Sequence, residues 1–219
     1  GISAWAIRSH TRHRSRQGAM MGRPLERIES GRKARNRVLL VTEGTTEKRY
    51  FSGLKERWCN VSIITPISSV TDAENLVRFC KKQMGHYGIE PEDGDLAICV
   101  FDFDNNPEKK LQRAAKIARE NNILLAASNP CFELWIAIHF TDVERFMTVG
   151  ELTSLVGKFI KGYSKSGNFN GVLFPLMNRA LTRADHIWDK NGLKGREAID
   201  MPNPCTNVHI AVESINSLK

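Results

Sequence analysis

The amino-acid sequence of this 219-residue chain predicts an α/β fold, namely a four-stranded parallel sheet flanked by helices, with a helical C-terminal part. Short runs of continuous apolar residues, typical of strands buried on both faces, alternate with longer stretches of helical spacing. After residue 140 the apolar runs stop and only helical stretches follow. An alternating β-α order of this kind favours a parallel sheet with helices on its faces.

Each predicted strand is a short run of apolar and β-branched residues: 38–42, 61–67, 96–101 and 123–127. Helices are expected after each strand, over 46–58, 72–85, 107–121 and 131–140. The second helix has Thr71 or Asp72 as a candidate N-cap, and Pro107 stands where proline is favoured at a helix start. Ser128-Asn129-Pro130 is expected to cap the fourth helix.

The C-terminal part is expected to hold helices over 149–159, 172–191 and 208–218, with a Gly/Ser/Asn-rich linker at 162–171. We therefore divide the chain into three parts. These are a basic N-terminal arm (1–36), an α/β core (37–140) and the helical C-terminal part (141–219).

The composition excludes several classes of protein. With 41% hydrophobic and 26% charged residues, the chain is neither wholly disordered nor collagen-like. No apolar run approaches the roughly 20 residues that span a bilayer, so no membrane association is expected. Five scattered cysteines without CxxC spacing indicate neither a disulfide scaffold nor a zinc cluster. Three of them have apolar neighbours, which favours buried thiols in a reducing cytoplasm.

The net charge of +8 lies at the start of the chain. Residues 1–37 carry ten Lys and Arg and two acids, whereas the rest of the chain has 22 of each sign. Basic arms often bind nucleic acid, although a solvated tail is an equally common outcome. The chain begins with Gly, and Met20 and Met21 follow later, so residues 1–19 are suspected to be an expression remnant or a leader.

Three acids follow predicted strands. Glu43 comes directly after the first strand, and Asp102 and Asp104 follow the third. Ligands of open α/β sheets bind at the carboxyl ends of the strands, and strand residues two apart share a face. Neighbouring carboxylates repel each other unless a proton or a cation intervenes. Mg²⁺ prefers oxygen ligands, so these acids predict a shared Mg²⁺ site, in which Mn²⁺ is a possible replacement.

Simpler explanations exist for each acid. A Glu-Gly pair after a strand is usually only a turn, and Asp-x-Asp before Asn-Asn-Pro is commonly loop and cap chemistry. Three residues are candidates to support the acids from a second layer: Glu47, Asn129 and Glu133. Capping is the alternative for all three, because acids and amides stabilise helix starts in any case.

Four cations are candidate contacts to the phosphates of a nucleic acid: Arg35, Arg37, Lys48 and Arg49. Plain solvated charges are the alternative for the two that lie on the first helix. No aromatic-rich RNA-binding signature is present, so RNA and DNA are equally open as substrates.

This combination of acids is similar to the Toprim domain of topoisomerases, primases and OLD-type nucleases. In those domains a strand-terminal Glu and a later Asp-x-Asp bind Mg²⁺ for phosphodiester chemistry. The chain more closely resembles the RloB-like family, Toprim-type proteins associated with phage-resistance and restriction loci. The likeness covers roughly residues 31–219, and four stretches carry it: 37–51, 100–104, 128–135 and 203–209. The Asn-Pro-Cys-Phe-Glu-Leu-Trp sequence at 129–135 is its most specific part.

The resemblance implies that Glu43 is the Toprim glutamate and that Asp102 and Asp104 are the metal-binding pair. Relatives often carry a polar or acidic residue where this chain has Phe103 and Asn105, and a third acid after the pair is absent here. The resemblance also implies a partner, a separate ATPase encoded at the same locus. Beside it, the chain would be the toxin or effector of an abortive-infection system against phage.

We therefore expect a Mg²⁺-dependent nuclease that cleaves RNA or DNA, with Glu43 as a metal ligand or as the general acid/base. The alternative is a non-catalytic subunit that uses a Toprim scaffold to bind nucleic acid or the ATPase. A phosphatase of the haloacid-dehalogenase kind is a weaker match, because its Asp-x-Asp normally follows the first strand. No Walker A motif is present, so any ATP dependence would come from another chain.

Overall fold

The computed structural model describes residues 36–56, 61–66, 68–70, 72–104, 106–193 and 199–218. All of these residues belong to one compact unit, Arg35–Lys219. Nearly all of the predicted basic arm, including the candidate Arg35, therefore lies outside the described residues, as does Thr71.

The sheet contains β1 (Arg37–Thr42), β2 (Ser62–Ile64), β3 (Leu96–Asp102), β4 (Ile123–Asn129) and β5 (Cys205–Thr206), in the order β2-β1-β3-β4-β5. The first four strands are parallel, which confirms the predicted α/β class with a mostly parallel sheet. The predicted number of four strands is wrong, because β5 pairs with β4 in the antiparallel direction. A strand of two residues is too short to show as an apolar run.

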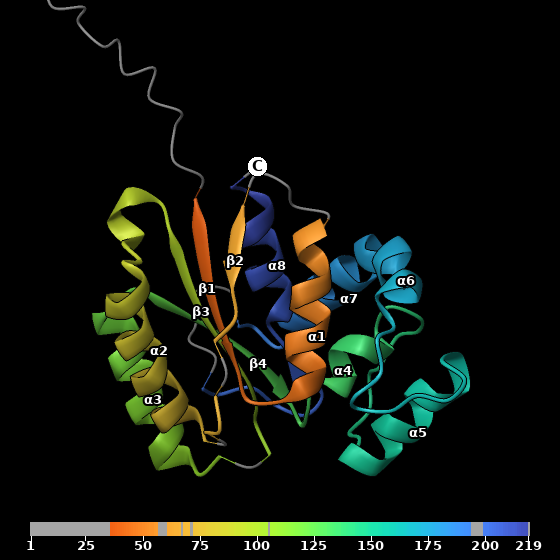
Figure 1. Ribbon diagram of the computed structural model, residues 1–219. Coiled ribbons are helices and arrows are strands. Elements are labelled where there is room, and N and C mark those ends of the chain that lie inside the picture. The colour runs from red at the N-terminus through yellow and green to blue at the C-terminus, as the bar shows by residue number, and fades with distance from the viewer. Residues whose placement is uncertain are drawn as a thin grey trace, which may run out of the picture. The chain divides into compact units, whose positions relative to one another are not determined.

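Helices cover both faces of the sheet (Figure 1). On one face lie α2 (Ala73–Tyr87) and α3 (Glu108–Glu120), and on the other lie α1 (Thr45–Gly53) and α8 (Val208–Asn216). Because β1 and β3 are covered on both sides, their central residues are almost completely buried. Double burial is the reason that these strands read as continuous apolar runs.

Local sequence explains the ends of α2. The Asp72 carboxylate accepts a hydrogen bond from the backbone N–H of Asn75 (3.1 Å), which settles the predicted choice of N-cap on Asp72. The helix ends at Gly88, whose φ of 61° lies in the left-handed region that glycine adopts without strain. The first helix is shorter than expected, since α1 stops at Gly53 and a 3₁₀ turn, Leu54–Glu56, follows.

The last helix of the α/β core is α4 (Glu133–Ala137), and the C-terminal part contains α5 (Val149–Phe159), α6 (Asn170–Leu173) and α7 (Met177–Lys190) before α8. The prediction that Asn129 caps the fourth helix is wrong. Asn129 is the last residue of β4, and its amide donates a hydrogen bond to the carbonyl of Met201 (2.7 Å). The residue before α4 is Phe132, which has no side-chain capping bond.

The Asn-Pro-Cys-Thr-Asn sequence at 203–207 attaches the C-terminal part to the edge of β4. The Asn207 amide accepts from the N–H of Ala127 (2.6 Å) and donates to the carbonyl of Leu125 (2.8 Å). Thr206 and Ser128 share a hydrogen bond between their hydroxyls (2.9 Å). These bonds satisfy the polar groups of β4 where no long strand covers them. Among the described residues, no helix has the length and apolar character that crossing a membrane would require.

Candidate active site

The candidate site lies where the strand order of the sheet reverses. From β1 the chain moves to β2 on one side, and it then crosses to β3 on the other side of β1. In open α/β sheets, ligands bind at the carboxyl ends of the strands beside such a reversal. Here those ends lead into Glu43 and Asp102, and the Glu43 carboxylate accepts a hydrogen bond from the Asp102 N–H (3.2 Å). The structure thus brings these two predicted acids together.

A pocket of about 250 Å³ opens at this point. Four carboxylates line it: Glu43, Glu47, Asp102 and Glu133. Glu47 and Glu133 are almost completely buried, with 3% and 1% of their surface exposed. The remaining lining residues are Gly44, Thr45, Thr46, Phe132 and Lys165. Two acids from strand ends and two from helix starts therefore face one cavity.

Aromatic packing holds α4 against α1, which brings Glu133 close to Glu47. The Tyr50 ring of α1 contacts Phe132 and Trp135 edge-on, with ring centroids 5.6 and 6.1 Å apart. Edge-on contacts of this kind are favourable and restrict how the two helices can be placed. A buried acid on each helix is thereby kept near the strand ends.

Gly44 leaves room for the Glu47 carboxylate. A Cβ atom at position 44 would collide with that carboxylate, although the backbone of Gly44 is in an ordinary extended conformation. A glycine has no Cβ and so permits another group to come close to its backbone. In the structure, the group that comes close is the side chain of Glu47.

Further hydrogen bonds fix the carboxylates of Asp102 and Glu133. The Asp102 carboxylate accepts from the backbone N–H of Phe132 (2.8 Å), just before α4. The Glu133 carboxylate accepts from the hydroxyl of Tyr163 (3.0 Å), and the ammonium of Lys165 lies 3.8 Å from the same oxygen. The last two contacts come from the segment between α5 and α6.

Asp104 lies in a different environment from Asp102. Its side chain is exposed and is not among the residues that line the pocket, although its charge helps to raise the pKa of Glu43. The expected side-by-side pair would require the strand to continue. β3 ends at Asp102, and the N–H of Asp104 donates to the carbonyl of Pro130 (3.2 Å), so the two-residue alternation stops before Asp104.

Glu43, Glu47 and Asp102 have raised pKa values. Burial, followed by the charges of Glu47, Glu133 and Glu43, raises the pKa of Asp102 well above its ordinary value. Burial, with the charges of Glu133 and Glu43, raises the pKa of Glu47 to about 7. Burial also raises the pKa of Glu43. Without an external cation, these groups are stabilised by holding protons.

The donor types suit a hard divalent cation, because Mg²⁺ is bound by carboxylate oxygens together with water. Within the described part of the chain, however, no three His, Cys, Asp or Glu side chains are grouped so that they could hold a metal ion. The residues of the pocket therefore match such a cation in chemistry and charge, but no three of these described acids are spaced to bind it together.

Comparison with known proteins places the chain in a family. A sequence model described as RloB-like protein matches residues 38–215. The chain belongs to the RloB-like family. No curated protein matches it. Among solved structures, it is similar to a GDP-L-fucose synthetase from Naegleria fowleri bound to NADP, at 14% identity and a TM-score of 0.30. That similarity covers 74% of this chain and 47% of the other, so the chain spans about half the length of that protein.

The RloB-like match includes every residue of the carboxylate pocket and begins one residue after Arg37. Arg37 starts β1, at the opposite end of the strand from Glu43. Its guanidinium lies 2.7 Å from the Asp95 carboxylate and also donates to the carbonyls of Tyr87 and Gly88. Arg37 is thus engaged in a contact that joins β1 to the start of β3.

The other predicted residues do not line the pocket. Lys48 and Arg49 lie on α1 outside it, and the Arg49 carbonyl accepts a hydrogen bond from the amide of Asn170 (3.0 Å). Asn129 at the end of β4 is held by Met201, as described above. For Arg49 and Asn129, the structure of this RloB-like protein thus shows contacts within the fold.

Sequence reasoning overlooked Tyr163 and Lys165, which lie in a stretch interpreted as a linker. A tyrosine and a lysine within a Gly/Ser/Asn-rich stretch were the available signals, but neither identifies its partner. It also treated Asn106 only as part of a loop. That buried amide accepts from the Ala73 N–H and donates to the Asp102 carbonyl (2.7 Å each), so it joins α2 to the end of β3.

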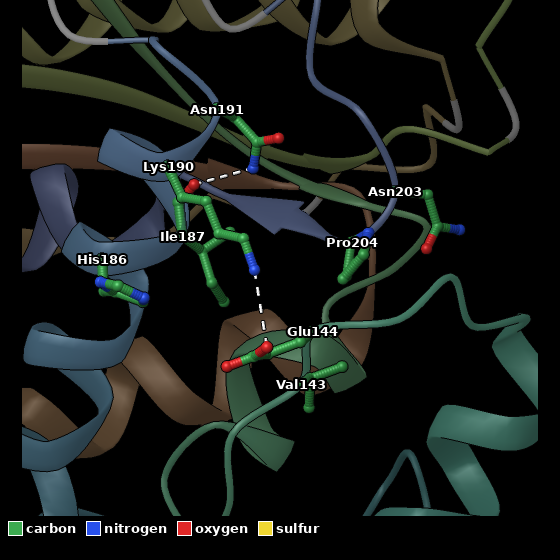
Figure 2. Close-up of a pocket in the computed structure, with 8 residues that line it drawn as sticks. All are labelled: Val143, Glu144, His186, Ile187, Lys190, Asn191, Asn203 and Pro204. Atoms are coloured by element: carbon green, nitrogen blue, oxygen red, sulfur yellow. Dashed lines mark hydrogen bonds and ion pairs between the residues drawn. The ribbon is translucent and has the colours of Figure 1, made fainter.

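A second pocket, of about 130 Å³, lies beside α7 and includes Asn203 and Pro204 of the C-terminal motif. Figure 2 shows the Lys190 ammonium extending toward the Glu144 carboxylate, and the two groups are 3.5 Å apart. The Asn203 amide both accepts from and donates to the backbone of Met147. Because these polar groups already have partners, this pocket lacks the uncompensated charge of the first.

Proposed function

We propose that this RloB-like protein is a Mg²⁺-dependent nuclease of the Toprim type that cleaves the phosphodiesters of RNA or DNA. The observation that carries this proposal is the set of four carboxylates around one pocket at the strand-order reversal. Perturbed acids grouped in a cleft are characteristic of functional sites, because a structural acid is usually paired with a cation or with several N–H donors.

In this proposal, Glu43 and Asp102 hold the metal ion, and Asp104 approaches it from the exposed side. When bound, Mg²⁺ would neutralise charge on the phosphate and on the leaving oxygen. Glu47 and Glu133 are more deeply buried than Glu43 and Asp102, and they add to the negative charge of the pocket. Glu43, whose pKa is raised by burial, is suited either to bind the metal or to exchange a proton with the attacking water.

We further propose that the nuclease is the effector of an anti-phage, abortive-infection system and that a separate ATPase is its partner. This part rests on membership of the RloB-like family and on the resemblance described above. Because no Walker A motif occurs in this chain, nucleotide hydrolysis would belong to the partner. The action is expected in the cytoplasm, where phage nucleic acid and host RNA are accessible.

The alternative proposal is a non-catalytic subunit that binds nucleic acid or the ATPase through the same scaffold. The observation that favours it is the spacing of the acids, since no three of the described metal-binding side chains form a ready group. The two proposals differ in one measurable property, which is turnover of a phosphodiester in the presence of Mg²⁺.

The test is a cleavage assay with the full chain, labelled RNA and DNA, and Mg²⁺, performed with and without the ATPase of the same locus. Wild-type protein should yield product that EDTA abolishes. Glu43→Gln should lower the rate at least 100-fold, because it removes a charge that the metal requires. The matched control is Glu74→Gln, which changes an acid on α2 that pairs with Arg78 (2.9 Å), outside the pocket. Absence of product under every condition would favour the non-catalytic subunit.

A further inference from the structure

The segment between α5 and α6, residues 160–169, reaches from the C-terminal part to the carboxylate pocket. The Thr46 hydroxyl of α1 donates a hydrogen bond to the carbonyl of Lys165 (3.0 Å). The Tyr163 hydroxyl donates to Glu133, two residues before Lys165. One backbone carbonyl and one side chain therefore anchor this segment on two helices that border the pocket.

Lys165 brings a positive charge to this pocket. Of the described residues that line it, Lys165 alone is a cation. Its ammonium lies 3.8 Å from the Glu133 carboxylate, and the side chain of Lys165 is 64% exposed whereas that of Glu133 is 2% exposed. The charges of Glu133, Asp102 and Glu47 raise the pKa of Lys165. One cation thus faces four acids without balancing them.

We propose that Lys165 is the resident cation of the carboxylate pocket and that a divalent cation displaces its ammonium. The displaced ammonium then binds a phosphate of the substrate. This inference rests on the proposed function. A lysine suits such an exchange, because its ammonium is a point charge on a flexible four-carbon stem. The anchored backbone keeps the ammonium within reach of the pocket, and the exposed side chain leaves it open to a phosphate.

The direction of the metal effect follows from electrostatics. The ammonium stabilises the carboxylates when metal is absent, so Mg²⁺ must displace it and binds less tightly than it would to the acids alone. At a distance near 4 Å and in a partly solvated setting, a unit charge changes binding by roughly three- to tenfold. Removing the charge of Lys165 should therefore tighten Mg²⁺ binding by that factor.

The first experiment is calorimetric titration of the full chain with MgCl₂ in the absence of nucleic acid. Lys165→Gln should bind Mg²⁺ three- to tenfold more tightly than wild type, and Lys165→Arg, which keeps the charge, should resemble wild type. Lys161→Gln is the matched control, since Lys161 is an exposed lysine of the same segment and does not line the pocket. Thermal unfolding of each variant establishes that it is folded. Equal affinities in all variants, or no Mg²⁺ binding in any, would overturn the resident-cation role.

The second experiment measures nucleic-acid binding over a salt series with Ca²⁺ in place of Mg²⁺, so that cleavage does not interfere. Lys165→Gln should make the plot of log affinity against log salt less steep, by the amount that corresponds to about one lost phosphate contact. Lys161→Gln should leave the slope unchanged. Equal slopes would overturn the phosphate contact. Neither experiment needs turnover. If Lys165→Gln binds Mg²⁺ more tightly but no variant cleaves nucleic acid, only the nuclease proposal is contradicted. If the protein cleaves nucleic acid but Lys165→Gln has the Mg²⁺ affinity of wild type, only the role of Lys165 is contradicted.

Discussion

The two ends of β3 carry acids in opposite electrostatic settings. Just before the strand, the Asp95 carboxylate accepts from the backbone N–H groups of Arg37 and Glu90 and pairs with the Arg37 guanidinium. These bonds hold the pKa of Asp95 below its ordinary value despite burial. At the other end, Asp102 accepts from the N–H of Phe132 but faces three further carboxylates, and its pKa is raised well above the ordinary value.

The difference separates a structural acid from a candidate functional one. At the amino end, the counter-charge comes from the chain itself, so the pair stabilises the junction of β1 and β3. At the carboxyl end, the chain supplies four acids and one lysine, and the remaining charge must be met by protons or by an external cation. An acid cluster that the fold leaves uncompensated is evidence for a ligand of opposite charge.

The largest expected effect is at the carboxyl end of β3. Asp102→Asn keeps the acceptor for the Phe132 N–H but removes one charge, so Mg²⁺-dependent cleavage should fall at least 100-fold. Nucleic-acid affinity without metal should be equal or slightly higher, because repulsion of phosphate decreases. Initial rates with Mg²⁺ and binding in EDTA measure the two effects.

Asp104→Asn is the comparison for that variant, because exposed Asp104 does not line the pocket and would approach the metal only from outside. Its cleavage rate should fall less than tenfold. Undiminished cleavage in Asp102→Asn would contradict the catalytic proposal, and equal losses in the two variants would restore the symmetric Asp-x-Asp pair expected from the sequence.

The second prediction concerns the amino end. Asp95→Asn removes the charge that pairs with Arg37, and the free energy of unfolding should fall by about 2 kcal/mol. Cleavage by the folded protein should be unchanged, because the site lies at the other end of the strand. Urea denaturation and initial rates decide this, with exposed Glu92→Gln as control. If Asp95→Asn lost cleavage activity without losing stability, Asp95 would not be a purely structural acid.

The third prediction uses pH to separate Glu47 from the rest of the protein. Folded Glu47, with its pKa near 7, keeps a proton that the unfolded chain releases above its ordinary value of 4.5. The free energy of unfolding of metal-free protein should therefore lose stabilisation from this group as pH rises from 5 to 8, by on the order of 1 to 2 kcal/mol. Saturating Mg²⁺ should restore stability at pH 8.

Glu47→Gln supplies the reference for this pH series. Burial lowers the pKa of His139 and His209 to about 4, and those groups add stability as pH rises toward 6.5, against the effect of Glu47. Both histidines are present in both proteins, so the difference between wild type and Glu47→Gln isolates the carboxylate. As pH rises, the free energy of unfolding of wild type should fall relative to that of Glu47→Gln. A constant difference would show that Glu47 titrates as an ordinary acid.

The sequence revealed the acids at the strand ends because local rules determine them. Burial on both faces makes β1 and β3 continuous apolar runs, and parallel strands bring their carboxyl ends to one edge. These two rules are sufficient to place Glu43 and Asp102 together. They fail for Asp104, since the turn after β3 depends on a contact with Pro130, which follows the next strand.

Contacts between distant parts of the chain were beyond local rules. The bond between Thr46 and the Lys165 carbonyl joins residues 119 apart, and no periodicity or motif signals it. β5 was overlooked for a related reason, since its two residues are held by pairing with β4 and by the amide of Asn207. Features that depend on tertiary partners, including the cation of the pocket, required the structure.

The smallest expected effect comes from removing residues 1–34, which precede Arg37 in the sequence. Residues 1–34 carry eight Lys and Arg and two acids. Their removal should weaken nucleic-acid binding a few-fold and flatten its salt dependence, because each cation that neutralises a phosphate releases a counterion. Mg²⁺ affinity and cleavage at saturating substrate should not change, since residues 35–219 remain. A full-length chain with those eight cations replaced by Gln should behave like the truncated one, which separates charge from length. If the salt slope is the same with and without the segment, its charge takes no part in binding, and recognition of nucleic acid belongs to residues 35–219 alone.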